Sequence, residues 1–395
     1  MAKRSNKKTR SNKRAGGAEG VLPALSSLTD LPAFGELKAS DAQRSVFADA
    51  CRRVCDAAGD DITAELALGC VVRLDRGFPA VLCDDGVFRA EFSTRLTKGG
   101  LRRGENSRAA VGDWVCARRP HGHDMGLIEE ILPRESDIAR WKGKARGEKQ
   151  TLAANVDVVL VVQQLGERGA DCERIARSAV IARDCGAEVA VVLTKADRAT
   201  DEEIADDVAG VREVLGSGCA LALTSSAAVG DEERRVRANA ERLDVPWGVA
   251  AVRGLVPAGR VAIVLGESGA GKSTLLNALL GHEALETSAV READDMGRHT
   301  TVARRMVSLP GAGVIVDEPG LRSLPIVGHE RGLAKVFPDI AEVAGECRFR
   351  DCTHTHEPGC GVLAAGFSEV RLACYLALAA EMRESAASLD PDVVI

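Results

Sequence analysis

The pattern of apolar and polar positions changes character near residue 150. Upstream, from Gly69, short apolar runs such as CVVRLD, PAVLCD and VFRAEF alternate with turn residues, and DWVCARR and GLIEEIL continue the series. Closely spaced short strands with turns between them predict a small β-barrel. Ahead of the barrel, the spacing predicts a helix over Asp41–Ala58, to which we assign no function.

Downstream, longer apolar runs alternate with helical segments. VDVVLVVQQL, AEVAVVLT and VAIVL have the character of buried strands, and DCERIARSAVIARDCGA has that of a helix. Fully apolar strands that alternate with helices predict a parallel, doubly wound sheet covered on both faces. After about Pro325 the chain becomes helical and carries several cysteines. We therefore expect a multidomain fold that combines an all-β unit, an α/β unit and a helical tail.

The composition is that of a soluble globular protein. The chain has 395 residues, of which 45% are hydrophobic and 28% charged, enough for two or three domains. It lacks an apolar run of about 18 residues, and its first residues lack the apolar stretch of a secretory signal. We expect a cytoplasmic monomer that does not contact membranes. Twelve cysteines, three of them between Cys347 and Cys360, indicate reduced thiols and one metal cluster rather than disulfides.

Basic residues are concentrated in two stretches of an acidic chain. The net charge is −6, and seven basic side chains in the first fourteen residues leave −13 for the remainder. This arm has too few apolar residues to fold alone, and its sequence is compatible with a solvated tail or with an RNA-binding arm. The second stretch, TRLTKGGLRRGENSR, suits backbone binding of nucleic acid by a small barrel, although a solvated loop is the alternative. Its basic residues are Arg95, Lys98, Arg102, Arg103 and Arg108.

GESGAGKS, from Gly266 to Ser273, matches the phosphate-loop pattern G-x-x-x-x-G-K-[ST]. It follows an apolar strand and opens a helix, which is the context that the motif requires. Backbone N–H groups of such a loop wrap phosphates, Lys272 bridges the β and γ oxygens, and Ser273 offers its hydroxyl to Mg²⁺.

TKAD, from Thr194 to Asp197, selects the base. Asp197 can accept hydrogen bonds from the N1–H and 2-amino groups of guanine, whereas adenine would leave the carboxylate unpaired. Lys195 would lay its stem along the base. Thr194 stands where Asn is commoner, and it keeps a hydroxyl but loses the amide that ties neighbouring loops together. In the TSSA stretch that follows, the backbone N–H of Ala227 could meet guanine O6.

These motifs stand in a rotated order. The base-reading loop precedes the phosphate loop, then GRHTT follows as a switch segment, and VIVDEPG ends a strand in D-x-x-G. Asp317 would hold Mg²⁺ through water, Gly320 N–H would meet the γ-phosphate, and Thr300 or Thr301 would complete the metal shell. Because domain termini usually lie close together, joining them and cutting another loop leaves a sheet intact. The order therefore predicts a circularly permuted GTPase domain.

The residues expected to contact the nucleotide are Thr194, Lys195, Ala196, Asp197, Ser226, Ala227, Gly266, Glu267, Ser268, Gly269, Ala270, Gly271, Lys272, Ser273, Thr274, Thr300, Thr301, Asp317 and Gly320. Those expected at Mg²⁺ are Ser273, Thr300 and Asp317.

The chain resembles the ribosome small-subunit-dependent GTPase A family, the permuted GTPases that act in late maturation of the small ribosomal subunit. The resemblance runs from about residue 68 to 385 and rests on VGDWV, ILPRES, LAANVDVVLVV, TKAD, SGAGKST, GRHTT, D-x-P-G and CRFRDCTHTHEPGC. It implies an oligonucleotide-binding (OB) barrel, a permuted GTPase domain and a small zinc domain. It also implies that the barrel and the zinc domain bind ribosomal RNA. The expected divisions are a basic arm (1–16), an N-terminal extension of unknown role (17–66), the OB barrel (67–150), the GTPase domain (151–330) and the zinc-binding domain (331–395).

The spacing C-x4-C-x-H-x5-C predicts a closed tetrahedral site for one structural Zn²⁺. Its ligands would be Cys347, Cys352, His354 and Cys360. His356 competes by spacing, and the family pattern falls on His354.

No residue at the usual position can orient the water that attacks the γ-phosphate. Leu321 follows D-x-x-G where Ras-type enzymes carry Gln, so that role must pass to another residue. The resemblance nominates His299 as the catalytic residue, because a neutral imidazole can position water near pH 7. The alternative is a histidine on the switch surface that contacts RNA or phosphate. Glu318 stands where the family has Thr or Ser, and its carboxylate would repel the γ-phosphate unless it turned away.

The leading hypothesis is a GTPase that binds the small ribosomal subunit and its rRNA and hydrolyses GTP to GDP and phosphate during late subunit maturation. Its cofactor would be Mg²⁺, and the state of its switch segment would be coupled to rRNA binding. The alternative is a GTP-dependent rRNA-binding module with little or no hydrolysis. A third hypothesis, an ATPase, would require Asp197 to be irrelevant.

Overall fold

The computed structural model describes residues 29–75, 78–98, 109–142, 148–166, 168–283, 304–317, 326 and 328–388. The predicted helix α1 has the bounds expected from the sequence, Asp41–Ala58. It begins at Ser40, whose hydroxyl caps the first turn, and ends at Gly59 in the left-handed conformation (φ 75°).

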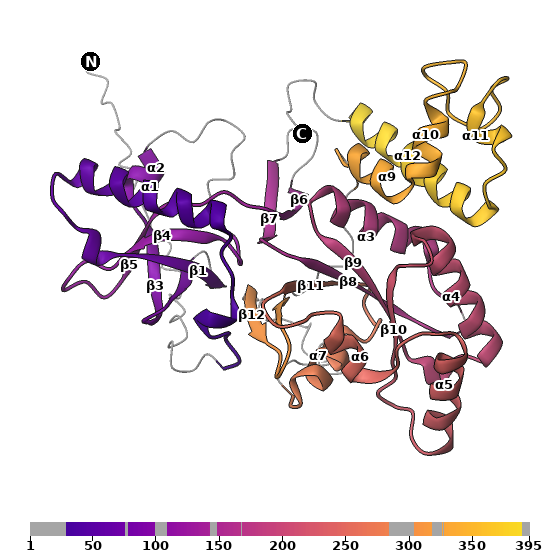
Figure 1. Ribbon diagram of the computed structural model, residues 1–395, viewed down its shortest axis with the longest axis horizontal. Coiled ribbons are helices and arrows are strands. Elements are labelled where there is room, and N and C mark those ends of the chain that lie inside the picture. Colours follow the sequence, from indigo (N-terminus) through magenta and orange to yellow (C-terminus); the bar gives the residue numbers. More distant parts are fainter. Residues whose placement is uncertain are drawn as a thin grey trace, which may run out of the picture.

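Five strands of the described chain close the predicted barrel, in the order β1-β2-β3-β5-β4 with β4 returning to β1 (Figure 1). Their bounds are β1 Leu66–Asp75, β2 Phe78–Cys83, β3 Gly86–Phe92, β4 Trp114–Arg118 and β5 Gly126–Ile131. The β3–β5 pair is parallel and the other pairs are antiparallel. The barrel interior is apolar, with Val71, Phe88 and Ile128 in its core. Helix α1 packs outside, on β4 and β1, while the short α2 (Thr94–Lys98) follows β3.

A second set of strands forms the α/β unit, in the order β10-β9-β8-β11-β13-β12. Their bounds are β8 Val158–Gln164, β9 Glu188–Thr194, β10 Ala220–Leu223, β11 Val261–Leu265, β12 Arg304–Ser308 and β13 Val314–Asp317. The first five in this order pair in parallel, as predicted, and β12 is antiparallel to β13. Strands β8, β9 and β10 precede β11 in the chain, and in the sheet they lie on the side of β11 that faces away from β13.

Helices cover both faces of this sheet. Side chains from α3, α4 and α5 enter one apolar core, and side chains from α6 and α7 enter the core of the other face. The bounds are α3 Cys172–Asp184, α4 Asp201–Leu215, α5 Asp231–Arg242, α6 Gly248–Gly254 and α7 Lys272–Leu280, with the short turn η4 at Ala196–Arg198.

The C-terminal helices pack on the α3 and α4 side of the sheet (Figure 1). They are α9 Glu330–Val336, α10 Pro338–Ala344, α11 Gly361–Ala364 and α12 Glu369–Ser388. Arg177 of α3 binds Glu381 of α12, with 2.6 Å between Nη1 and Oε1. Within the unit, the rings of Phe337 and Tyr375 meet edge to face. Among the described helices, none combines the length and hydropathy needed to cross a bilayer.

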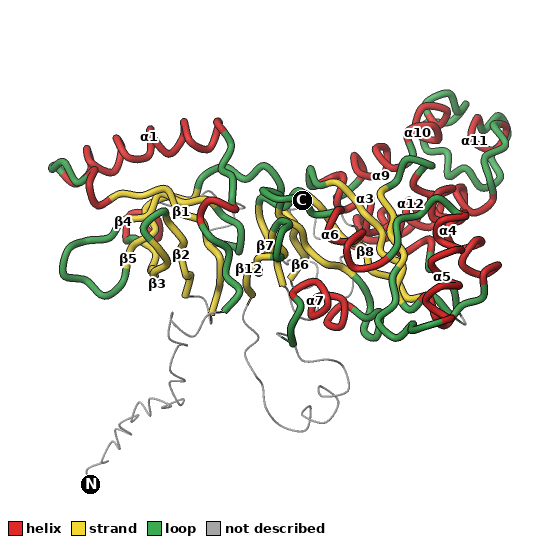
Figure 2. The backbone as a smooth tube through the Cα atoms, turned by 60° about the horizontal axis from the view of Figure 1, so that its bottom comes forward, coloured by secondary structure: helices red, strands yellow, loops and turns green. Residues whose placement is uncertain are grey.

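The barrel and the α/β unit are joined directly by strand pairing. Strand β12 pairs antiparallel with β1, with Arg305 opposite Arg73, so that one sheet runs through both units. Figure 2 shows the barrel and the α/β unit side by side, with β12 between them. The sequence pattern did not predict β12, because its residues RRMVS show neither clear alternation nor a continuous apolar run.

A strap of residues 29–40, with the turn η2 (Phe34–Glu36), connects the same two units. Ser308, at the end of β12, donates its N–H to the Asp30 carbonyl (2.8 Å) and its hydroxyl to Glu36 (2.7 Å). On the barrel side, Phe34 packs edge to face on Trp114, with 5.9 Å between ring centroids. The N-terminal extension, which received no function from its sequence, therefore has a structural role.

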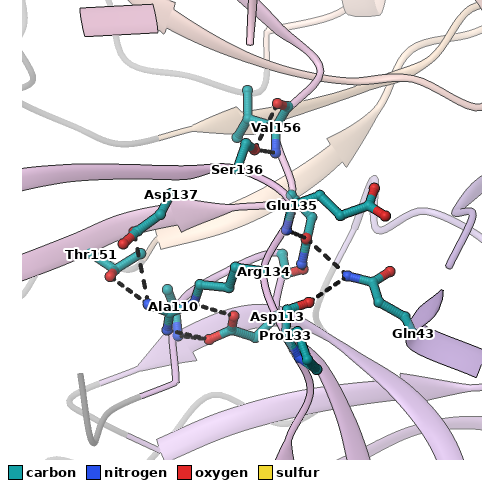
Figure 3. A network of polar contacts seen from close by, with 12 residues as sticks. Gln43, Ala110, Asp113, Pro133, Arg134, Glu135, Ser136, Asp137, Thr151 and Val156 are labelled. Atoms are coloured by element: carbon teal, nitrogen blue, oxygen red, sulfur yellow. Dashed lines mark hydrogen bonds and ion pairs between the residues drawn. The ribbon is translucent and has the colours of Figure 1, made fainter. Parts of the chain in front are cut away.

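A buried polar network connects the barrel to the hairpin that leads into the α/β unit (Figure 3). Asp113 is fully buried and accepts two hydrogen bonds from the Arg134 guanidinium, each 2.7 Å. Arg134 also donates to Thr151 at 2.6 Å, in the hairpin of β6 (Asp137–Lys142) and β7 (Glu148–Ala154). Neighbouring Gly112 has φ 94°, and a Cβ there would lie 2.0 Å from the Ala154 carbonyl oxygen. The VGDWV and PRES motifs thus fasten the barrel to the hairpin that leads into the α/β unit.

Candidate functional site

The phosphate loop connects β11 to α7 at the carboxyl edge of the parallel strands, where ligands of such sheets bind. Gly266 lies so close to β8 that a Cβ would be 2.5 Å from the Val162 carbonyl oxygen. Gly271, with φ 88°, precedes the first helical residue, Lys272. The ammonium of Lys272 donates to the carbonyls of Gly266 (2.5 Å) and Glu267 (2.6 Å), so it bends back over the loop. The predicted strand, loop and helix are thus present in the predicted order.

The TKAD loop follows β9, two strands away from β11, and it contacts the phosphate loop directly. The Thr194 hydroxyl lies 2.7 Å from the Ala270 carbonyl oxygen and 3.2 Å from that of Gln163. Thr194 lacks the amide of the commoner Asn, as expected, but the hydroxyl that it keeps joins the two loops. Its hydroxyl is buried and close enough to make the tie without an amide.

Lys195 adds a second bridge between the same two loops. Its backbone is left-handed (φ 56°), and its ammonium donates to the Gly269 carbonyl and to the Gln164 side chain, each at 2.6 Å. Partial burial lowers the pKa of this ammonium from its ordinary value. The TKAD loop and the phosphate loop therefore form one connected surface, although more than sixty residues separate them in the chain.

Ser225 is a residue that the sequence reasoning missed. Its hydroxyl donates to the half-buried Asp197 carboxylate and accepts the N–H groups of Ala227 (3.1 Å) and Ala228 (3.0 Å). The predicted Ser226 and Ala227 are exposed beside it. A pair of adjacent serines in TSSA gives no indication of which one turns toward the carboxylate, because that depends on the local turn.

The residues expected at Mg²⁺ are described only in part. Ser273 lies in the first turn of α7, and Asp317 ends β13, half-buried and opposite Arg305 of β12. The other switch residues lie outside the described residues: His299, Thr300, Thr301, Glu318, Gly320 and Leu321.

The predicted zinc ligands come together in the C-terminal unit. Ligand atoms of Cys347, Cys352, His354 and Cys360 all lie within 4.8 Å of one another. The His354 Nδ1 atom is 3.5 Å from the Cys347 sulfur and 3.4 Å from that of Cys360, and these two sulfurs are 3.9 Å apart. Tetrahedral zinc has bonds of about 2.3 Å to sulfur and about 2.0 Å to nitrogen. These bonds place a nitrogen ligand roughly 3.5 Å from a sulfur ligand, and two sulfur ligands roughly 3.8 Å from each other. The four residues therefore fit this metal.

The local backbone explains why His354 rather than His356 joins the cluster. His354 is left-handed (φ 60°) and buried, whereas His356 is exposed, with its Nδ1 atom 2.9 Å from the Thr355 hydroxyl. Glu357 holds the loop by accepting the N–H groups of Thr353 (2.8 Å) and Thr355 (3.1 Å). The Thr353 hydroxyl and N–H hold the pKa of the Glu357 carboxyl far below its ordinary value.

Comparison with protein families gives a match over a segment that includes the candidate nucleotide site. The family described as RsgA GTPase matches residues 131–327. A protein of Streptomyces coelicolor named small ribosomal subunit biogenesis GTPase RsgA is 40% identical over 326 residues, 82% of each chain. A protein of the same name from Leptospira interrogans is 33% identical over 321 residues, covering 80% of this chain and 82% of that one.

Two solved structures share the fold. YjeQ from Thermotoga maritima superposes with a TM-score of 0.55 and 22% identity, covering 80% of this chain and 99% of that one. YloQ, described as a circularly permuted GTPase, gives a TM-score of 0.54 and 23% identity, with 81% and 96% of the two chains covered. About a fifth of this chain therefore has no counterpart in YjeQ.

Proposed function

The chain belongs to the RsgA GTPase family, and on that premise we propose that it hydrolyses GTP while bound to the small ribosomal subunit during late subunit maturation. GTPase activity follows from the family itself. The subunit is proposed because the relatives from Streptomyces coelicolor and Leptospira interrogans carry small ribosomal subunit biogenesis in their names.

The observation that carries the proposal is the direct contact between the TKAD loop and the phosphate loop. Thr194 and Lys195 are hydrogen-bonded to the carbonyls of Ala270 and Gly269, so base and phosphates can be held on one surface. Ser225 orients the Asp197 carboxylate, the group that we propose reads guanine. Adenine would leave that carboxylate unpaired, which supports GTP over ATP.

We assign the phosphate and metal contacts by residue type and position. The loop N–H groups from Gly266 onward and Lys272 would hold the phosphates, and Ser273, Thr300 and Asp317 would hold Mg²⁺, directly or through water. Mg²⁺ would neutralise charge that develops during phosphoryl transfer. His299 would orient the attacking water, since Leu321 cannot.

The C-terminal cysteine and histidine cluster suits one structural Zn²⁺, because its four ligands complete a tetrahedral shell. We further propose that the barrel, the basic arm and the zinc unit contact rRNA. The proposed domain division is the basic arm (1–16), the N-terminal extension (17–66), the OB barrel (67–150), the GTPase domain (151–330) and the zinc-binding domain (331–395). The border between residues 150 and 151 falls within β7.

Turnover measured with and without purified small subunits tests the proposal. We expect slow GTP hydrolysis by the protein alone and a large stimulation by small subunits but not by large subunits. GTP binding without stimulated hydrolysis would instead support the alternative, a GTP-dependent rRNA-binding module.

We also propose that the nucleotide state of the protein is coupled to its binding of the small subunit. Subunit binding measured with GTP-like and GDP-bound protein tests this coupling. We expect tighter binding with a non-hydrolysable GTP analogue than with GDP, and subunits must then tighten analogue binding by the same factor. His299→Ala should bind subunits with GTP but hydrolyse it slowly. Undiminished stimulated turnover in this variant would remove the proposed catalytic role of His299.

A further inference from the structure

Arg174 of α3 contacts the phosphate loop and has no role in the assignments above. We propose that Arg174 is a positioning residue that neutralises the Glu267 carboxylate of the phosphate loop and thereby sets the relative affinity of the site for GTP and GDP. This inference rests on the proposed nucleotide site.

The topology brings Arg174 to the nucleotide edge of the sheet. Strands β8 and β11 are parallel neighbours, so their carboxyl ends meet at one edge. The phosphate loop leaves from β11 at that edge, and α3 begins there after β8. Asp171 caps α3 by accepting the backbone N–H of Arg174, which places Arg174 in the first turn.

Two carboxylates hold the Arg174 side chain in this position. Its Nη1 group donates to Glu267, and its Nε group donates to Asp171 at 3.2 Å. The Arg174 side chain is 32% exposed and that of Glu267 is 53% exposed, so both are in contact with solvent. An ion pair this exposed contributes little to folding stability. The ion pair matters instead because Arg174 offsets the negative charge of Glu267 near a bound nucleotide.

Glu267 is an anion within a loop whose function is to bind anions. An uncompensated carboxylate there would repel the phosphates, and it would repel GTP more than GDP because GTP carries one more negative charge. The ammonium groups of Lys272 and Lys195 are engaged with loop carbonyls. Arg174 is the cation that contacts the Glu267 carboxylate among the described ion pairs.

Arg177, one turn further along α3, provides a matched control. It is the same residue type on the same helix, but it binds Glu381 of α12 and Glu173 rather than the phosphate loop. A variant there removes a cation from α3 while leaving Glu267 neutralised.

The experiment measures the affinity of the full chain for a non-hydrolysable GTP analogue and for GDP, by calorimetry in Mg²⁺ buffer. Arg174→Ala should weaken analogue binding on the order of tenfold and GDP binding less, which lowers the ratio of the two affinities. Arg174→Lys should keep most of the ratio. Added salt should reduce the effect, because it screens charges at the loop mouth. Arg177→Ala should leave the ratio unchanged.

The double variant Arg174→Ala/Glu267→Gln isolates the charge from the packing of α3. If Arg174 acts by neutralising Glu267, removing the carboxylate should restore the wild-type ratio. Equal weakening of both nucleotides in Arg174→Ala, or no recovery in the double variant, would overturn the inference while leaving the nucleotide site intact. Failure of the unmodified protein to bind either nucleotide would instead defeat the proposed function.

Discussion

Replacing Asp113 with alanine should destabilise the barrel strongly, because it leaves the Arg134 guanidinium without its main partner. The Asp113 side chain is fully buried, and only 14% of the Arg134 side chain is exposed. The substitution removes both hydrogen bonds of a bidentate ion pair and also the acceptor of the Ala110 N–H. Removing one partner of a buried ion pair costs about 3–5 kcal/mol, since the remaining charge stays desolvated.

Urea unfolding followed by tryptophan fluorescence is a suitable assay, because Trp114 is 3% exposed and adjacent to the substituted residue. Circular dichroism and nucleotide binding should be measured in parallel, since a multidomain protein can unfold in more than one step. We expect the barrel transition to move to lower urea while GTP binding persists. Asp231→Ala, which breaks an exposed pair with Arg234, should leave the transition in place.

A second variant separates the ion pair from the packing around it. Asp113→Ala/Arg134→Met removes both charges, so it should recover part of the stability lost in the single variant. A loss below about 1 kcal/mol in Asp113→Ala, or a double variant no more stable than the single one, would refute this account of the network.

Three further variants address the nucleotide site, the metal and the strap. Asp197→Asn should weaken GTP binding by about 1–3 kcal/mol, and unchanged discrimination between GTP and ATP would argue against the role of TKAD. Cys352→Ser should lose zinc and disorder the C-terminal unit while keeping GTP binding, and full zinc occupancy by metal analysis would contradict the ligand set. Phe34→Ala removes the aromatic contact with Trp114, so it should lower stability by about 1–3 kcal/mol and speed proteolysis of the strap. A cleavage rate equal to that of the unmodified chain would show that the contact between Phe34 and Trp114 does not hold the strap in place.

The sequence by itself determined the features that depend on neighbouring residues. A phosphate loop needs its glycines and lysine at fixed spacing after a strand and before a helix, so GESGAGKS predicts its own local structure. Helix α1 was predicted to its observed bounds because Ser40 and Gly59 supply local start and stop signals. The zinc spacing likewise identified three cysteines, and the choice between His354 and His356 rested on resemblance until the structure placed His354 among them.

Only the tertiary structure decided which distant groups meet. Strands β12, β6 and β7 have polar or mixed sequences, and they are strands because a partner strand satisfies their backbone groups. The Thr194 hydroxyl reaches Ala270 because β9, β8 and β11 are neighbours in the sheet, although the two residues are 76 positions apart. The strap received no role from its sequence for the same reason, since Phe34 and Glu36 acquire their contacts from Trp114 and Ser308. Local sequence specifies turns, caps and ligand spacing, whereas contacts between segments depend on the complete packing of the sheet.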